Sequence, residues 1–363
     1  VKVNGAIMSV RNMGDIAFVI LRKHDGVLQT VYEKGVTDAD FAELREETFV
    51  EVSGVLRKEE RAPRGMELRL KSVRILSKPE EPMPIAVSKW KMSASLESKL
   101  DVRSLTLRNL RERARFRIQE GIARAFREYL HGEGFTEIHS PKIGAKGAEG
   151  GSNLFRLDYF HRPAVLEQSP QLYKQMMVGV FDRVFETGPV FRAEKHNTKR
   201  HLNEYTSVDF EMGYIENFED IMAMEQEMLR YTFGRLQETC GAELSLLKAE
   251  VPVITEIPRI RFSEAKELVS RVYKRAFSEK LDFEPEEEKL LCEYVKKTTG
   301  SDFVFVTHYP SAKRPFYAMD DPADSRYTLS FDLLFRGLEI TTGGQRIHDY
   351  ETLLKKIEEK GMD

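Results

Sequence analysis

The chain has 363 residues, of which 41% are hydrophobic and 32% charged, a balance typical of a globular protein with about two or three domains. Its net charge of −3 excludes a uniformly basic nucleic-acid binder but allows a local basic face. No stretch approaches the roughly 18 apolar residues of a transmembrane helix. Cys240 and Cys292 have no cysteine or histidine nearby, which argues against a disulfide framework or a zinc site and fits a reducing cytoplasm.

Residues 1–76 show the alternation of short strands, which we predict over 1–11, 16–22, 27–32, 48–57 and 66–76, with a short helix in 35–47. Five strands with a helix in that gap predict a small barrel of the OB type, although any small β-barrel would give a similar pattern. Residues 77–90 carry Pro79, Pro82 and Pro84 and predict a stiff linker. We therefore expect a barrel domain over 1–76, a linker or hinge over 77–107 and a second domain over 108–363.

The second domain alternates helical and strand-like segments. One helical face is predicted to hold Phe116, Ile122, Ala125, Phe126, Tyr129 and Leu130, and Gly132 and Gly134 end this helix. Residues 184–191, 207–214, 303–307, 329–335 and 337–342 look like strands, and residues 217–240 and 282–299 look like helices. The whole chain thus belongs to the α+β class. It has neither a P-loop nor a Rossmann phosphate-binding loop.

A charged hairpin is predicted around Phe191-Arg192-Ala193-Glu194, a basic segment over 195–203 and a returning strand through Asp209 and Glu211. On a strand, Arg192 and Glu194 would share one face. Such an arginine can hold a phosphate bidentately, and the glutamate can accept from an adenine amino group. The simpler interpretation is a solvated charged hairpin.

Two further groups of residues could carry chemistry. The carboxylate of Glu149, before two glycines, could bind an ammonium group, and Lys174 in Gln168–Lys174 could bind a carboxylate. Asp332 and Glu339 lie seven residues apart on consecutive strands and could form a magnesium seat, or a surface salt-bridge pair. Arg346, after Gly343-Gly344, could point into a pocket or into solvent.

In this order, the segments resemble the class II aminoacyl-tRNA synthetases, and in particular the aspartyl enzymes of archaeal type. Gly134–Pro141 is similar to motif 1 of that family, the dimerisation segment, and Phe191–Glu211 is similar to motif 2. The resemblance implies a homodimer that activates L-aspartate with ATP and Mg²⁺ and transfers it to tRNA-Asp. A synthetase-like paralogue that binds tRNA or an amino acid without catalysis is the main alternative, and an asparagine synthetase of this fold would lack the barrel.

The resemblance also implies a role for each matching residue. In the ATP site, Arg192 would be the catalytic residue that holds the α-phosphate and the reacting carboxylate; Glu194 and Tyr205 would bind adenine, and Arg200 and His201 the outer phosphates. Magnesium would be held by Asp332 and Glu339, the latter also counting as an ATP-binding residue. The amino end of aspartate would be bound by Glu149, Ser169 and Gln171, and its side-chain carboxylate by Lys174, Asp209 and Arg346.

Lys174 distinguishes between relatives in this subclass. The substrate of an asparaginyl enzyme has a neutral side chain, so a lysine here would be left unpaired at a desolvated site, at a cost of about several kcal/mol. The sequence Gln171–Lys174 therefore favours aspartate. A lysyl enzyme fits worse, because it needs acidic residues to hold its substrate.

The barrel would bind the tRNA anticodon. Phe18 matches the family's base-stacking aromatic residue and Gln29 its base-reading amide, with Arg11 and Glu67 as weaker candidates. The structural alternative for Phe18 is a residue of the barrel core. Pro63 stands where enzymes strict for tRNA-Asp tend to have lysine, and Met8 where they tend to have tryptophan, which predicts an enzyme that also charges tRNA-Asn.

One departure from the family lies at the end of the chain. Motif 3, which holds an adenine-binding arginine, should follow Asp363, and the chain also begins directly in a strand. We therefore expect the sequence to be a fragment, with a natural paralogue without motif 3 as the alternative.

Overall fold

A computed structural model describes residues 1–145, 147, 154–195 and 201–362. The chain forms two compact units, Val1–Arg117 and Ile118–Asp363, and each is described by itself.

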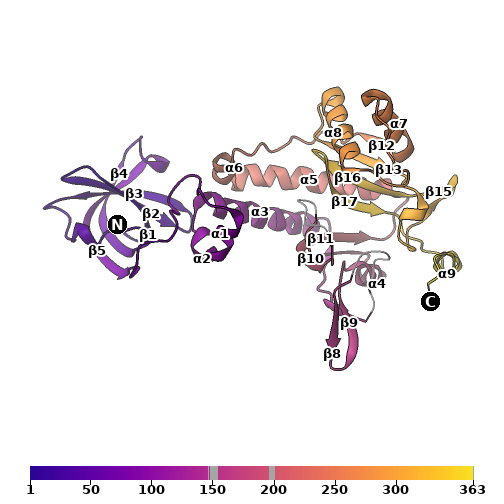
Figure 1. Cartoon of the computed structure of the whole chain (residues 1–363), viewed down its shortest axis with the longest axis horizontal. Helices are drawn as coiled ribbons and strands as arrows, with labels where there is room; N and C mark the ends of the chain where they lie inside the picture. The colour runs from indigo at the N-terminus through magenta and orange to yellow at the C-terminus, as the bar shows by residue number, and fades with distance from the viewer. Residues whose placement is uncertain (146, 148–153, 196–200, 363) are drawn as a thin grey trace. The chain divides into compact units, whose positions relative to one another are not determined.

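The first unit contains a closed five-stranded barrel (Figure 1). Its strands are β1 (Lys2–Asn12), β2 (Ile16–Lys23), β3 (Gly26–Glu33), β4 (Phe49–Lys58) and β5 (Met66–Ser77), in the order β1-β2-β3-β5-β4, so all five predicted strands are confirmed. Alternation along β2 buries Ala17, Val19 and Leu21 in the barrel core. Strands β4 and β5 approach closely at Gly54, where a Cβ atom would lie 2.1 Å from the carbonyl oxygen of Arg69.

The helix predicted over 35–47 is wrong: the segment holds only a 3-10 turn, η1 (Phe41–Glu43). Asp38 explains the difference, because its N–H donates to the Lys71 carbonyl oxygen at 2.7 Å and the residue bridges to Ser72 of β5. The backbone is therefore already paired to the barrel. Asp40 then caps η1 by accepting from the Ala42 N–H at 2.9 Å.

The segment after the barrel is fastened to it by polar contacts. Ser88 donates to Glu46 at 3.0 Å, and Arg108 donates at 2.7 Å to the buried carboxylate of Glu47. The short helices α1 (Leu96–Asp101) and α2 (Arg103–Thr106) follow, and then α3 (Leu110–Gly132) begins. The unit boundary falls within α3.

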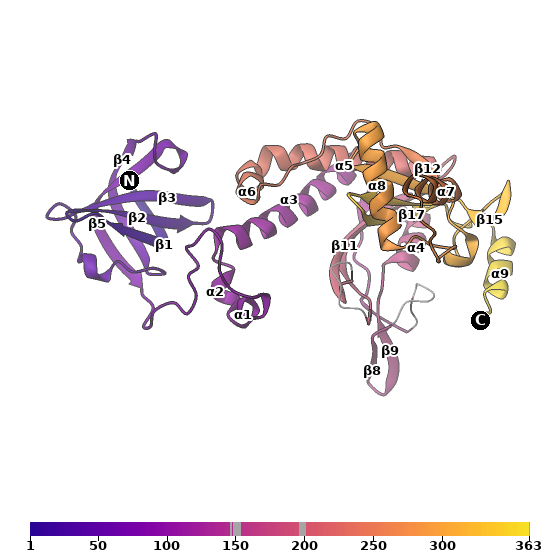
Figure 2. The same ribbon diagram turned by 45° about the horizontal axis from the view of Figure 1, so that its top comes forward.

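In the second unit, α3 and α5 (Glu219–Thr239) pack against a three-stranded sheet (Figure 2). This sheet has the order β11-β10-β6, from β6 (Thr136–Glu137), β10 (Arg183–Phe191) and β11 (Glu204–Met212). Phe126 and Leu130 are buried against it, as predicted. Phe116 and Ile122, which are predicted for the same helical face, are exposed.

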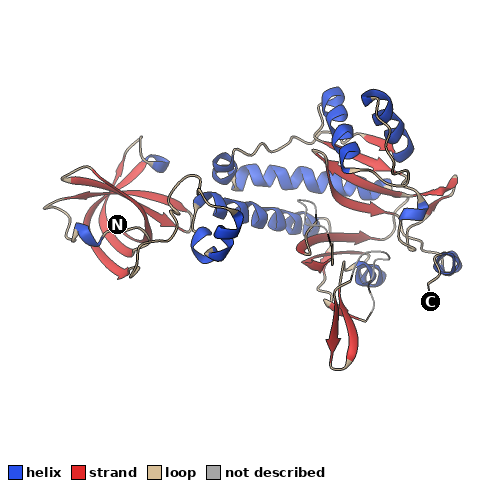
Figure 3. Ribbon diagram, viewed as in Figure 1, coloured by secondary structure: helices blue, strands red, loops and turns tan. Residues whose placement is uncertain are grey.

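A four-stranded sheet carries the largest core (Figure 3). Its order is β12-β13-β16-β17, from β12 (Arg259–Arg261), β13 (Phe303–Thr307), β16 (Ser330–Phe335) and β17 (Leu338–Gly344). Every residue of β13 is buried because helices cover both faces. Val304 and Val306 pack with α7 (Phe262–Tyr273) and α8 (Pro285–Thr299), whereas Phe303 and Phe305 pack on the α5 side.

Smaller elements complete the unit. They are α4 (Gln171–Phe181), α6 (Gly241–Leu247), α9 (Tyr350–Glu359), a sheet of β7 (Ile143–Gly144), β9 (Arg162–Leu166) and β8 (Arg156–Tyr159), the pair β14 (Asp320–Asp321) and β15 (Asp324–Thr328), and the turn η3 (Ser311–Lys313). None of the helices in the described part of the chain is long and apolar enough to cross a membrane.

Candidate functional site

The predicted charged hairpin exists, and the predicted end of its first strand at residue 191 is confirmed. Strands β10 and β11 pair from Arg183–Met212 to Phe191–Glu204, so the strand stops at Phe191, before Arg192. The Glu194 N–H donates to the Arg192 carbonyl oxygen at 2.7 Å, which closes a tight turn. The prediction that Arg192 and Glu194 share a strand face is therefore wrong, because the backbone turns between them.

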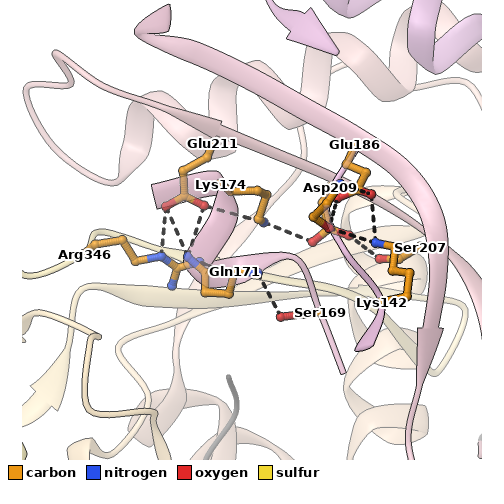
Figure 4. A network of polar contacts seen from close by, with 10 residues as sticks. Lys142, Ser169, Gln171, Lys174, Glu186, Ser207, Asp209, Glu211 and Arg346 are labelled. Carbon is orange, nitrogen blue, oxygen red and sulfur yellow. Dashed lines mark hydrogen bonds and ion pairs between the residues drawn. The ribbon is translucent and has the colours of Figure 1, made fainter. Parts of the chain in front are cut away.

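A buried lysine lies at the centre of the site (Figure 4). Lys174 on α4 is only 4% exposed, and its ammonium group lies 3.0 Å from Asp209 and 3.5 Å from Glu211, both on β11. Alternation on a strand places Asp209 and Glu211 on one face, where α4 presents the lysine. The hydroxyl of Ser207 donates to the second oxygen of Asp209.

Arg346 joins this cluster from the segment after β17. Its Nε lies 3.2 Å from Glu211, and its Nη2 donates to Gln171 Oε1 at 2.9 Å. Ser169 accepts at 3.3 Å from the Gln171 N–H at the start of α4. The structure thus brings together five of the six residues predicted for one substrate, namely Ser169, Gln171, Lys174, Asp209 and Arg346.

The charged groups of the cluster stabilise one another's ionised forms. Burial opposes the charge of Lys174, but the carboxylates of Asp209 and Glu211 outweigh it and raise the lysine's pKa. Burial also opposes ionisation of Asp209, but Lys174, Ser207 and the more distant Arg192 lower its pKa. Two cations and two carboxylates therefore coexist in a desolvated site, and an incoming carboxylate can pair with Lys174 or Arg346 only by sharing them.

Asp332 and Glu339 form the predicted carboxylate pair on β16 and β17. Asp332 is buried and accepts at 2.7 Å from Arg314, and Thr342 donates to Glu339 at 2.8 Å. Although Glu339 is partly open to solvent, removal of its carboxyl from water and the charge of Asp332 raise its pKa to about 8.

Asp332 is already paired with Arg314, and the raised pKa of Glu339 indicates that a further positive charge beside the two carboxylates would be favourable. Oxygen ligands of this kind suit Mg²⁺, so Asp332 and Glu339 fit that ion. Bound there, it would neutralise charge on neighbouring phosphate groups.

A third carboxyl group lies beside this pair. Glu225 on α5 is 3% exposed and accepts a hydrogen bond from the hydroxyl of Thr341 on β17. Burial raises the pKa of Glu225 to about 7. The charge of Asp332 adds to this shift, and the hydrogen bond from Thr341 opposes it.

A cavity of about 700 Å³ lies between β11 and β17, and its lining includes Asp209 and Glu225 but neither Asp332 nor Glu339. Lys174, Glu211 and Arg346 line its polar side, and Met228 and Phe331 line an apolar side. Each of β11 and β17 is an edge strand among the described residues. The cavity is large enough for a small organic substrate.

The structure describes only some of the residues that are predicted to bind ATP. The guanidinium group of Arg192 lies 5.9 Å from the ring centre of Tyr205, and the buried Arg192 Nε has no hydrogen-bond partner among the described residues. His201 is exposed. Glu149 and Arg200 lie outside the described residues.

Sequence reasoning missed Arg314, Glu211 and Glu225 as members of the site. Glu211 could have been found from its spacing of two from Asp209, since both face Lys174. Arg314 and Glu225 come from η3 and α5, far along the chain, and no local pattern marks them.

The barrel of the first unit presents the residues predicted for a second site on its outer face. Phe18 is half-buried and lies outside the barrel core, whose members on β2 are Ala17, Val19 and Leu21. Arg11 pairs with Phe18 across β1 and β2.

The predicted amide and its neighbours lie on adjoining strands of the same unit. Gln29 on β3 pairs with Glu67 on β5 and donates to it at 3.0 Å, while Arg69 donates to Glu67 at 2.8 Å. Pro63 begins the short turn η2 (Pro63–Gly65), which leads into β5.

Residues 95–363 match the family described as tRNA synthetases class II (D, K and N), and residues 1–76 match the OB-fold nucleic acid binding domain. The chain belongs to the class II tRNA synthetases. The predicted OB-type barrel, the α+β class and the class II resemblance are confirmed.

Two named relatives show which synthetases the chain is similar to. It is 48% identical to "Aspartate--tRNA(Asp/Asn) ligase" from Deinococcus radiodurans, over 98% of this chain and 82% of the relative. It is 40% identical to "Aspartate--tRNA(Asp) ligase" from Pyrococcus furiosus, over 100% of this chain and 84% of the relative.

A crystal structure of asparaginyl-tRNA synthetase from Pyrococcus horikoshii with asparaginyl-adenylate matches the synthetase with a TM-score of 0.87 and 31% identity, over 100% of this chain and 84% of that chain. Since an asparaginyl enzyme has the same fold, the fold does not select the amino acid. The residues of the site must do so.

Proposed function

We propose that this synthetase is an aspartate–tRNA ligase, which activates L-aspartate with ATP and transfers it to tRNA-Asp. The observation that carries the proposal is the pair of cations that line the cavity, Lys174, which is buried, and Arg346, which is partly buried. A substrate carboxylate can share both cations with Asp209 and Glu211 through charge-assisted hydrogen bonds, whereas a carboxamide offers them only a neutral acceptor. The names of the relatives agree with this choice.

The reaction needs no protein nucleophile. The aspartate α-carboxylate attacks the α-phosphorus of ATP and pyrophosphate leaves; the terminal ribose hydroxyl of tRNA then attacks the aspartyl carbonyl carbon and AMP leaves. Arg192 stabilises the negative charge that develops on the α-phosphate, with its unpartnered Nε as one available donor. Glu194 and Tyr205 hold adenine, His201 contacts the outer phosphates, and the Lys174 cluster orients the amino acid, so catalysis comes from position and charge.

We also propose a magnesium site, contacts to the anticodon, a homodimer and a cytoplasmic location. Asp332 and Glu339 hold Mg²⁺, Phe18 stacks on an anticodon base, and Gln29 reads a base edge. The segment Gly134–Pro141 joins two copies into a homodimer. Cys240 and Cys292 are buried and form no disulfide among the described residues, which agrees with a reducing cytoplasm.

We further propose that the protein charges two tRNAs. Pro63 in η2 and Met8, which lies at a bulge of β1, replace the larger residues of strict enzymes, so the protein also aspartylates tRNA-Asn. The Deinococcus radiodurans relative is named for both tRNAs. Aspartylation of purified tRNA-Asp but not of tRNA-Asn would contradict this part alone.

Exchange of labelled pyrophosphate into ATP tests the activity. We expect exchange with aspartate and none with asparagine or lysine, and we expect Arg192→Ala to reduce exchange by at least about a thousandfold, since it removes the main charge at the reacting phosphate. Exchange near the wild-type rate in Arg192→Ala would refute the assignment.

A further inference from the structure

A second buried ion pair lies next to the Lys174 cluster and takes no part in the proposed reaction. Glu186 on β10 is 3% exposed, and Lys142 donates to its Oε1 at 2.8 Å. Ser140 completes the group: its N–H donates to Oε1 at 3.1 Å, and its hydroxyl donates to Oε2 at 2.6 Å. Both oxygens of Glu186 are therefore bound, and its orientation is fixed.

Glu186 lies directly opposite Asp209 in the register of β10 and β11. Opposite residues of an antiparallel pair project from the same face, with Cβ atoms about 5 Å apart. Figure 4 shows the two carboxylates next to each other, each with its own lysine. Like charges at this separation repel, so each carboxylate is directed toward its own cation.

Asp209 is itself bound to two donors. Lys174 lies 3.0 Å from Oδ1, and the Ser207 hydroxyl donates to Oδ2. The ammonium of Lys174 in turn lies between Asp209 and Glu211. Its position therefore depends on which way the carboxylate of Asp209 points.

We propose that Glu186, held by Lys142 and Ser140, is a positioning residue for recognition of the amino acid. Its negative charge keeps the Asp209 carboxylate turned toward Lys174, and thereby fixes the ammonium that receives the acidic side chain of the substrate. This inference rests on the proposed function, because it assigns the role of Lys174 to aspartate binding.

A purely structural role would have a different signature. In that case the pair only fills space and satisfies buried polar groups. The site is tightly packed, since a Cβ atom at Gly188 would lie 3.1 Å from Glu186 Oε1. Removal of both charges together leaves no unpaired buried ion and is often neutral for stability. The neutral pair Lys142→Met/Glu186→Gln thus separates the two roles.

The test measures pyrophosphate exchange for this double variant. We expect the KM for aspartate to rise about tenfold, as is typical when the support behind a binding group is lost, with less than about a twofold change in the KM for ATP. The temperature of unfolding should stay close to that of the wild type. An unchanged KM for aspartate, or equal rises for aspartate and ATP, would overturn the inference.

The chain offers a matched control in Lys266 and Glu287. Their charged groups lie 2.7 Å apart with side chains 17% and 0% exposed, on α7 and α8. The variant Lys266→Met/Glu287→Gln removes a comparable buried pair and should leave the KM for aspartate unchanged; a rise equal to that of the first double variant would also overturn the inference. Absence of aspartate-dependent exchange in the wild type would refute the proposed function instead.

Discussion

The ammonium group of Lys174 lies 3.0 Å from a carboxylate oxygen of Asp209, although the lysine is almost completely buried. Lys174 therefore stays charged without a substrate, because its partners are already in place and raise its pKa. In the proposed function, such a site favours an anion because its charged donors form stronger hydrogen bonds to a carboxylate than to a neutral amide.

The first prediction concerns this cation. Lys174→Met should lower kcat/KM for aspartate in pyrophosphate exchange by at least about a hundredfold, because Asp209 and Glu211 lose their shared cation and repel the substrate carboxylate. The KM for ATP should change little. Aspartate kcat/KM within tenfold of the wild type, in a variant whose circular dichroism is native, would exclude Lys174 from recognition.

The second prediction concerns stability and pH. The pKa of Glu225 is raised from 4.5 to about 7, so the folded state binds this proton more tightly than the unfolded state. The contribution of Glu225 to stability is therefore complete below about pH 4.5 and is lost as the pH rises through about 7.

Glu225→Gln keeps a group that can bond to the Thr341 hydroxyl but carries no charge. The variant should be more stable than the wild type at pH 8, by up to about 3 kcal/mol, and nearly equal to it at pH 4.5. Urea unfolding of both proteins at the two pH values measures the difference. A difference that is the same at both values would show that Glu225 does not titrate in this range.

The sequence predicted most of the fold because strand alternation and helical periodicity are local signals. It failed at Asp38, where a distant partner determines the backbone: the residue pairs with β5 in place of forming a helix. It also failed at Arg192 and Glu194, which a local turn, closed by the hydrogen bond between them, removes from a common strand face. Residue type and order identified Lys174 and Arg346, whereas the role of Arg314 depends on how η3 lies against β16.

The third prediction concerns the barrel. The buried carboxylate of Glu67 accepts from the Gln29 amide, which leaves the amide oxygen of Gln29 to meet a base. Glu67→Gln removes this constraint and should weaken binding of a tRNA-Asp anticodon stem–loop about tenfold, a loss of about one charged hydrogen bond. Pyrophosphate exchange needs no tRNA and should be unaffected.

Glu51 on β4 provides the control, since it pairs with Lys2 and Arg74 in the same barrel. Glu51→Gln should change stem–loop affinity by less than about twofold, because surface ion pairs contribute little. Equal effects of the two substitutions, measured by fluorescence anisotropy, would mean that Glu67 acts only through the net charge of the barrel.

The last prediction concerns the backbone that leads to Arg346. At Gly343 on β17, a Cβ atom would lie 2.3 Å from the ring of Phe331, which is fully packed in the core and cannot move aside. Gly343→Ala should therefore destabilise the second unit by about 1–3 kcal/mol and raise the KM for aspartate, since it shifts the strand that leads to Arg346. Gly179→Ala is the counterpart within α4, where nothing lies within 4 Å of the added atom; it should stabilise by up to about 1 kcal/mol. Thermal unfolding of both variants measures these opposite signs, and a Gly343→Ala protein as stable as the wild type would show that β17 adjusts without cost.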